Sequence, residues 1–389
     1  MSQNKLIRST FILSAAHYTS NILGLIYIFP FTAIVGQKGI ALYSYGYLPY
    51  TVLLSLATLG VPLAVSKFVS KYNALGDYAT GKRLFQSGIL FMGMTGFVSF
   101  LILFLLAPVI SSWIIRGPSE LGGNSLEDIT FTIRMVSFAL LIVPAISLVR
   151  GYFQGFQSMG PTAISQVVEQ LVRIVFILSL TYIIVFVMKK DVGLAVGFAV
   201  FGAFVGAVGA LFVLIYFWLK RRKGINELVK NSRAKQKLSL TEMYKELIAY
   251  ALPISFVGLA VPLFQLIDLF TFNNALMSSG VDQKTAEISF AALSQTAHKL
   301  ILIPVSFATA LSISLVPTIT ESFTNNDGRM LRKQITQTYQ IILFLAIPAA
   351  AGLSLLSYPA FGTLYGLEDV AIGGHILRYY APASIFFAL

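Results

Sequence analysis

Ten long apolar runs constrain the fold of this chain more than any other feature of its sequence. They lie near residues 9–35, 40–66, 84–110, 131–149, 161–188, 192–219, 247–273, 286–317, 335–357 and 371–389. A bilayer needs roughly 20 apolar residues of helix to cross its core, and each run supplies about that length. Because backbone polar groups find no water in lipid, the runs are expected to be helices. The sequence therefore predicts an all-α polytopic membrane protein.

The composition excludes most other classes of protein. The 389 residues are 56% hydrophobic and only 11% charged, with a mean hydropathy of +0.78, whereas a soluble domain carries about 25% charged residues. The net charge of +12 is therefore not a sign of nucleic-acid binding. Cysteine is absent, so no disulfide or thiol nucleophile exists. Neither a Walker loop nor an HExxH motif occurs, and the three histidines lack metal-site spacing. We expect no catalytic residues and no metal, and therefore no enzyme.

Basic residues divide sharply between alternate connections of the predicted spans. Of the 28 Lys and Arg residues, 19 fall in one set of connections, which includes the chain start and the loop at 220–245. The positive-inside rule then places the N-terminus and this loop in the cytoplasm. The cluster at 220–237 is interpreted as a topology signal that can contact anionic lipid. Ser239-Leu-Thr-Glu242 is interpreted as a capping box before the seventh span.

A short internal repeat predicts two lobes. Ser55-Leu-Ala-Thr-Leu59 resembles Ser306-Phe-Ala-Thr-Ala310, and the same offset carries Lys82 onto Lys333. The offset spans six helices, so the two copies keep their orientation and form a parallel repeat. Each lobe is expected to contain six helices. The second lobe is expected to be incomplete, with about two spans missing, if the chain is part of a longer protein.

The predicted division follows from this repeat. The N-terminal lobe, spans 1–6, covers residues 1–219, and a basic cytoplasmic linker covers 220–245. The partial C-terminal lobe, spans 7–10, covers 246–389. Two such lobes are what a transporter needs to alternate access to a central site.

Charged residues inside the spans are the candidate site residues, because each costs several kcal/mol in the bilayer unless it has a partner or a role. Lys299, beside His298, lies well inside the eighth run and is a candidate cation for an anionic substrate. Arg173 lies in the fifth run, one turn after Glu169, and the two can pair at i, i+4. This pair is either structural or part of a cationic cavity. Asp268, in the seventh run, either binds a cation or proton or is a solvated residue near the membrane interface.

Several stretches resemble a known family. Arg150-Gly-Tyr-Phe-Gln-Gly-Phe-Gln-Ser-Met-Gly-Pro-Thr-Ala-Ile-Ser-Gln-Val-Val-Glu-Gln170, continuing to Arg173, is similar to the polysaccharide exporters of the SpoVB, YtgP and MurJ types. Leu6-Ile-Arg-Ser-Thr10 and Gly60-Val-Pro-Leu-Ala-Val-Ser-Lys67 resemble the same family. The SpoVB and YtgP types are Gram-positive proteins within the MurJ branch of the multidrug/oligosaccharidyl-lipid/polysaccharide exporter superfamily, and the resemblance covers the whole chain.

The resemblance implies both a substrate and residue roles. MurJ-type members flip lipid II, the undecaprenyl-pyrophosphate-linked peptidoglycan precursor. Their eighth helix carries a basic residue where Ala297-His298-Lys299-Leu300 stands here, which points to Lys299. In sodium-linked members an acid of the seventh helix contributes to the ion site, and Asp268 in Leu266-Ile-Asp-Leu269 resembles its surroundings. Many Gram-negative-type members have an essential Arg in the first helix where Asn21 stands here. The cationic cavity is therefore expected to use Arg173 and Lys299 instead.

The leading hypothesis is a lipid II flippase of the bacterial cytoplasmic membrane that works by alternating access. It has no cofactor, but sodium or protons are possible coupling cations. Its partners are expected to be the lipid-linked glycan precursor, membrane lipids and proteins of cell-wall synthesis, and not nucleic acid. Alternatives are an exporter of another lipid-linked polysaccharide, of capsule, teichoic or spore-cortex type, or a cation-coupled multidrug exporter. A scaffold or a glycan polymerase using Asp268, Glu287 or Asp369 is a third class.

Overall fold

Helices make up nearly all of the part of the chain that the computed structural model describes, which is residues 3–58, 60–116, 123–232, 240–306, 308, 322 and 327–389. No strand occurs in these ranges, so the expected all-α class is confirmed. The chain divides into two compact units. Unit 1 comprises Met1–Val35 and Leu42–Ala275, and unit 2 comprises Gly36–Ala41 and Leu276–Leu389.

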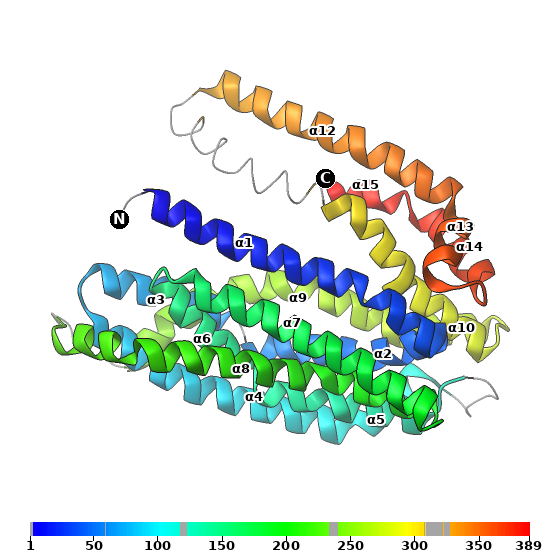
Figure 1. Ribbon diagram of the computed structural model, residues 1–389, viewed down its shortest axis with the longest axis horizontal. Helices are drawn as coiled ribbons and strands as arrows, with labels where there is room; N and C mark the ends of the chain where they lie inside the picture. Colours follow the sequence, from blue (N-terminus) through cyan, green and yellow to red (C-terminus); the bar gives the residue numbers. More distant parts are fainter. Residues whose placement is uncertain are drawn as a thin grey trace. The chain divides into compact units, whose positions relative to one another are not determined.

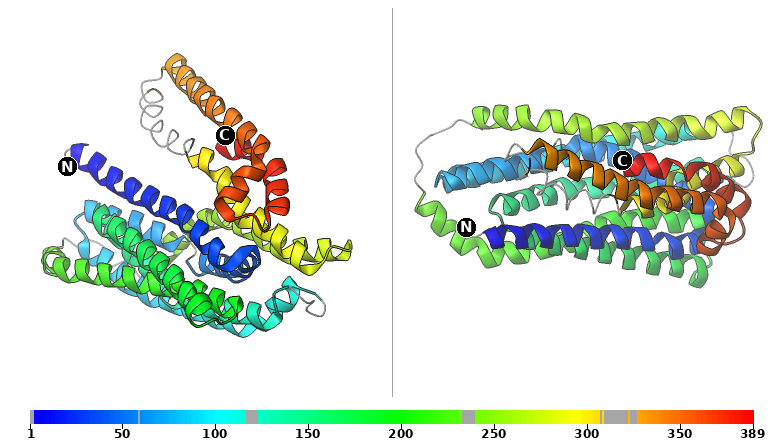
Figure 2. Two further views of the ribbon diagram at one scale, coloured as in Figure 1. Left: turned by 45° about the vertical axis from the view of Figure 1, so that its right-hand side comes forward. Right: turned by 90° about the horizontal axis from the view of Figure 1, so that it is seen from above.

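Unit 1 is a layered bundle of long helices (Figure 1). Its elements are α1 (Gln3–Ile26), α2 (Ile28–Thr58), α3 (Val61–Ala74), α4 (Tyr78–Ile114), α5 (Leu126–Ser137), η1 (Phe138–Leu141), α6 (Val143–Gly155), α7 (Met159–Tyr182), η2 (Ile183–Val187), α8 (Val192–Lys230) and most of α9 (Leu240–Ser278). Helix α7 packs between α1 and α8, and the three run side by side in Figure 2. Helix α6 packs against both α3 and α4.

Unit 2 contains shorter elements. They are α10 (Gln283–Ala291), the π-helical turn η3 (Ala292–Thr296), α12 (Gly328–Leu355), α13 (Ser357–Tyr365), α14 (Val370–Tyr380) and α15 (Ala383–Ala388). Helices α13 and α14 pack together, α14 contacts η3, and α15 packs on α12. The six-residue segment Gly36–Ala41 belongs to this unit, where the hydroxyl of Thr296 donates to Gln37 Oε1 at 3.2 Å.

Eight stretches of helix are long and apolar enough to cross a membrane, counted over the described residues. They are Ile28–Ala74, Tyr78–Ile114, Leu126–Gly155, Met159–Val187, Val192–Lys230, Ser255–Ser278, Gln283–Ser306 and Gly328–Leu355. This set differs from the ten predicted runs at both ends of the chain. The run at 9–35 is interrupted at Tyr27, between α1 and α2, and the run at 371–389 is divided near Pro382 into α14 and α15.

Helix α2 runs through the predicted connection between the first two runs and is only kinked there. Gly36 has φ 68° and ψ 177°, a backbone conformation that residues with a Cβ rarely adopt. The apolar run at 40–66 is likewise divided, because α2 ends at Thr58 and α3 begins at Val61 after Gly60, whose φ is 63°. Glycines therefore mark both interruptions of an otherwise helical segment.

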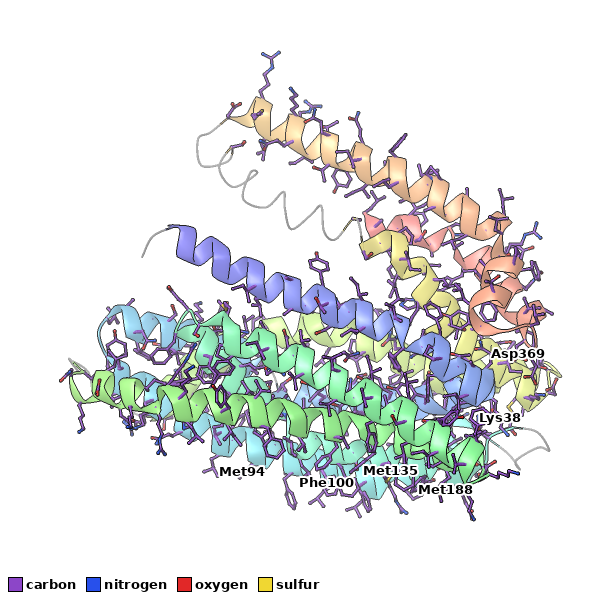
Figure 3. All side chains as sticks on the ribbon, viewed as in Figure 1. Lys38, Met94, Phe100, Met135, Met188 and Asp369 are labelled. Carbon is purple, nitrogen blue, oxygen red and sulfur yellow. The ribbon has the colours of Figure 1, made fainter. Side chains whose placement is uncertain are left out.

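Helix α4 has an exposed apolar face that suits contact with lipid. Its side chains at Leu90, Met94 and Leu105 are 68%, 61% and 66% exposed, in a helix that is long and apolar enough to cross a membrane. Figure 3 shows Met94 projecting away from the bundle. In lipid such exposure carries no hydrophobic penalty, so helix association depends on close packing and polar contacts.

Close packing of α6 on α3 depends on two glycines in the stretch that resembles the exporter family. A Cβ on Gly151 would lie 2.2 Å from the carbonyl oxygen of Pro62, and a Cβ on Gly155 would lie 2.7 Å from the Cβ of Val69. Gly151 and Gly155 are spaced as in a GxxxG pair, which lets two backbones approach closely in membranes. The motif therefore has a packing role.

The predicted linker at 220–245 is partly helical, because α8 continues to Lys230 and α9 begins at Leu240. Residues 233–239 lie outside the described ranges, and with them the Ser239 of the predicted capping box. Most of the second repeat copy at 306–310 also lies outside the described residues. The internal repeat therefore stays a prediction.

Replacing Asp77 by alanine is expected to destabilise the start of α4 by about 1 kcal/mol, the usual value for losing an N-cap. Asp77 Oδ1 accepts from the Thr80 amide at 3.1 Å, and Oδ2 accepts from the Thr80 hydroxyl at 2.7 Å. Thermal unfolding in detergent measures the change. Asp77→Asn keeps the capping oxygen and should lose less than half as much; an equal loss would contradict the capping role.

Candidate functional site

An ion pair inside unit 1 joins α6 to α7. Arg150 Nη2 donates to Glu169 Oε2 at 2.8 Å, and the two side chains are only 15% and 19% exposed. Arg150 Nε also donates to Ser165 Oγ at 2.9 Å. Ser165 in turn donates to the carbonyl oxygen of Thr162, one turn back on α7. Arg150 is thus held by a carboxylate and a hydroxyl on successive turns of α7.

This ion pair corrects the local pairing expected from the sequence. Glu169 was expected to pair with Arg173 at i, i+4 on the same helix. Among the described residues the ion pair of Glu169 is instead with Arg150 of α6, and Arg173 has none. A charge from a neighbouring helix outcompetes the local partner because it reaches Glu169 with good hydrogen-bond geometry.

Arg173 lies against a row of tyrosines on α2. Its Nη1 donates to Tyr47 Oη at 3.4 Å, and its guanidinium carbon lies 5.8 Å from the centre of the Tyr47 ring. Tyr43 stacks on Tyr47 with ring centres 5.5 Å apart. The hydroxyl of Tyr43 lies 3.4 Å from that of Tyr27, which is at the junction of α1 and α2. The cation is therefore stabilised by aromatic faces and hydroxyl groups.

The Nε of Arg173 is buried and has no hydrogen-bond partner in the described part of the chain. A buried donor without a partner is costly, so a water molecule or an anionic oxygen of a ligand is needed to satisfy it. Helix α8 packs closely on α7 beside Arg173 because residue 206 is a glycine. A Cβ on Gly206 would lie 2.7 Å from the Glu169 carbonyl oxygen and 3.0 Å from the Cβ of Arg173. Arg173 remains a candidate for binding an anion.

In unit 2, His298 is held by aromatic residues from the end of the chain. Its Nδ1 lies 2.8 Å from Tyr380 Oη, and its ring stacks on Tyr380 with centres 5.9 Å apart. Phe387 meets the same ring edge-on at 5.8 Å. His298 thus has a packing partner on α14 and another on α15, while Lys299 is the next residue of the same helix and is partly buried.

Immediately before His298 the helix contains the π-helical turn η3. Such turns are rare and occur often at functional sites. The hydroxyl of Tyr365 donates to the carbonyl oxygen of Thr296 at 3.0 Å, within this region. Sequence reasoning did not identify Tyr365, Tyr380 or the π turn, because no periodicity in the sequence shows contacts across more than 60 residues.

Asp268 is exposed on α9. The amides that sequence reasoning placed near it are engaged elsewhere. Asn273 donates to Tyr45 Oη at 2.6 Å, and Asn274 donates to the carbonyl oxygens of Trp113 and Phe270. No group of three or more His, Cys, Asp or Glu side chains that could hold a metal ion occurs among the described residues.

The fold defines the class of protein. It matches the inward-facing conformation of a multidrug resistance MATE family transporter of the MOP superfamily, with TM-score 0.70, 13% identity, and coverage of 95% of this chain and 81% of that one. A MOP superfamily transporter from Pyrococcus furiosus matches with TM-score 0.58, 12% identity, and coverage of 99% and 82%. The chain is a multi-pass membrane protein with the MOP transporter fold.

The sequence then identifies the family. Residues 6–323 match the model of the polysaccharide biosynthesis protein family, and the chain belongs to that family. The Bacillus subtilis lipid II flippase MurJ is 47% identical over 99% of this chain and 71% of its own length. Stage V sporulation protein B of the same organism is 24% identical over 100% of this chain and 71% of its own. The resemblance noted in the sequence is confirmed.

Proposed function

We propose that this protein is a transporter, and not an enzyme, that flips lipid II across the bacterial cytoplasmic membrane. The observation that carries the proposal is the 47% identity to a lipid II flippase over 99% of the chain. The transporter fold is consistent with it. The basic residues within its apolar helices suit a substrate whose headgroup is joined to the lipid through pyrophosphate.

We propose Lys299 and Arg173 as phosphate-binding residues, and the surroundings of each support this role in a different way. Arg173 offers the buried Nε described above. Lys299 follows the π turn and lies beside His298, whose ring is fixed by Tyr380. Glu169 is proposed to act indirectly, by holding Arg150 at 2.8 Å and thereby fixing α6 on α7.

The proposal extends to the movement of the lobes, the orientation in the membrane, the coupling ion and the protein partners. The lobes 1–219 and 246–389, joined by the linker 220–245, would rock to alternate access. The N-terminus would lie in the cytoplasm, and sodium or protons would drive transport, with Asp268 as one candidate ligand. Proteins of cell-wall synthesis would be partners. Labelling of a cysteine placed before residue 3 tests the orientation, because this chain contains no other cysteine.

A depletion strain provides the test of substrate. When this protein is depleted from its bacterial host, lipid II should accumulate on the cytoplasmic side of the membrane and become inaccessible to an external probe. Renewed expression of the protein should restore access. Unchanged access in a strain without other flippases would contradict the proposal.

Replacing Lys299 by methionine is expected to abolish flipping while the protein stays folded, because the side chain keeps its length and loses its charge. Lys299→Arg should keep measurable activity. Lys284→Met is the matched control, since Lys284 is exposed at the start of the same helix. Probe access is measured together with membrane abundance. Full flipping by Lys299→Met would remove this residue from the site.

A second candidate substrate is another polyprenyl-linked glycan, because a sporulation protein is also similar to all of this chain, over 71% of its own length. That similarity is 24%, against 47% for the lipid II flippase, so lipid II is preferred. If depletion leaves lipid II access unchanged and blocks export of a different lipid-linked glycan, the second candidate replaces the first. Drug resistance conferred by the protein would instead favour a multidrug exporter.

A further inference from the structure

An apolar groove of about 370 Å³ lies in unit 1 between α4 and α8. Its lining includes Gln86 and Ile89 of α4, Val149 of α6, and Leu211, Ile215 and Trp218 of α8. All three helices belong to stretches that are long and apolar enough to cross a membrane. Its volume falls in the range of small-molecule sites.

The groove opens at the outer surface of the unit. Ile215 is 44% exposed, and Gln86 of the opposite wall is exposed as well. In the hydrocarbon region of a membrane, an open apolar groove is filled by alkyl chains, because no water is available and an empty groove loses dispersion contacts. The occupant is therefore expected to be a lipid.

One end of the groove is marked by Trp218. Its ring stacks on Phe85 with centres 5.0 Å apart and lies 5.9 Å from the ring of Tyr152. Tryptophan favours the level of the lipid headgroups, where one end of the indole is wet. A lipid chain in the groove would therefore have its headgroup near this end.

Basic residues lie beyond Trp218 at the same end. Arg222 follows it by one turn on the same face of α8, and Lys82 precedes Gln86 by one turn on α4. Lys82 Nζ donates to Asn226 Oδ1 at 3.0 Å, which joins the two helices there. Arg222 is exposed, and it forms no ion pair with a described residue, including Glu227 on its own helix.

The neighbouring Arg221, unlike Arg222, is engaged in contacts within unit 1. It donates to Ser158 Oγ and lies over the rings of Phe153 and Phe217, 5.8 and 5.6 Å from their centres. Arg221 is therefore committed to contacts within unit 1. Arg222 remains available to a ligand outside.

We propose that this groove is a binding site for an anionic phospholipid. One acyl chain lies along the groove between α4 and α8, and the phosphate contacts Arg222 and Lys82. Charge complementarity selects an anionic lipid over a zwitterionic one, since basic residues near a membrane surface attract anionic headgroups. The site is separate from the residues proposed to bind the transported substrate.

Quenching of Trp218 by lipids brominated on the acyl chain tests the proposal. The chain has two tryptophans, so Trp113→Phe leaves Trp218 as the reporter of the groove. The protein is reconstituted in phosphatidylcholine that contains a varied fraction of brominated phosphatidylglycerol or of brominated phosphatidylcholine. Half-maximal quenching is expected at an about thirtyfold lower fraction of the anionic lipid, the effect of two basic residues near the headgroup.

Two matched controls complete the experiment. Trp218→Phe leaves Trp113, which is 52% exposed, and its quenching should not distinguish the two lipids. Lys82→Gln with Arg222→Gln should abolish the preference at Trp218, whereas Lys189→Gln with Lys190→Gln, exposed bases of the α7–α8 connection, should retain it. Equal quenching of Trp218 by both lipids, or a preference that survives loss of Lys82 and Arg222, would overturn the proposal.

Discussion

Replacing Gly151 by alanine should prevent α6 from packing on α3 and should strongly reduce the amount of folded protein. The added Cβ would lie 2.2 Å from the carbonyl oxygen of Pro62 and 3.0 Å from its carbonyl carbon. These are backbone atoms, which cannot rotate away as a side chain can. Overpacking of a helix interface costs about 1–3 kcal/mol or more, so a loss at the upper end of that range is expected.

A glycine elsewhere gives the matched comparison. A Cβ on Gly93 of α4 would have nothing within 4 Å. Gly93→Ala should therefore leave the protein unchanged or stabilise it by up to about 1 kcal/mol through helix propensity. Thermal unfolding and monodispersity in detergent distinguish the two variants. If Gly151→Ala were as stable as Gly93→Ala, the close packing of α6 on α3 would be refuted.

The second large effect is expected at Arg150. Replacing it by methionine leaves the Glu169 carboxylate without its ion-pair partner, with only 19% of that side chain exposed. Removing one member of a buried ion pair costs about 3–5 kcal/mol, because the remaining charge is uncompensated. Partial exposure places the expected loss near the lower end of this range.

A double-mutant cycle shows whether the loss comes from the pair. Arg150→Met combined with Glu169→Gln should be more stable than Arg150→Met alone, because no charge is left unpaired. The exposed pair of Lys71 and Glu246, at 3.4 Å with side chains 50% and 52% exposed, is the control. Lys71→Met should change stability by less than about 1 kcal/mol. Equal losses at Arg150 and Lys71 would mean that burial of the pair has no energetic effect.

Sequence reasoning predicted the class of fold well because lipid imposes a strong constraint. A helix that crosses a bilayer must be long and apolar, and runs such as 84–110 and 192–219 have no other interpretation. Hydropathy does not report backbone geometry, so the interruptions at Tyr27 and near Pro382 were missed. The kink at Gly36 was anticipated only as a boundary between two runs.

Contacts of the candidate site were harder to predict. The i, i+4 rule considers one helix alone, and it paired Glu169 with Arg173 although Arg150 lies in a stretch already recognised as a family motif. The contact of His298 with Tyr380 joins residues 82 positions apart, and nothing in the local sequence indicates it. The tyrosines at 43 and 47 were visible in the sequence, but their role beside Arg173 depends on how α2 packs on α7.

The π-helical turn before His298 has a geometric consequence for Lys299. An α-helix advances by about 100° of rotation per residue, and a π turn accommodates one residue more than an α turn. Converting Ala292–Thr296 to regular α-helix would therefore swing His298 and Lys299 around the helix axis by about that angle relative to α10. Two hydrogen bonds oppose this rotation, one from Tyr365 to the carbonyl oxygen of Thr296 and one between Tyr380 and His298. The Lys299 side chain can therefore change the direction it faces without unwinding of the helix.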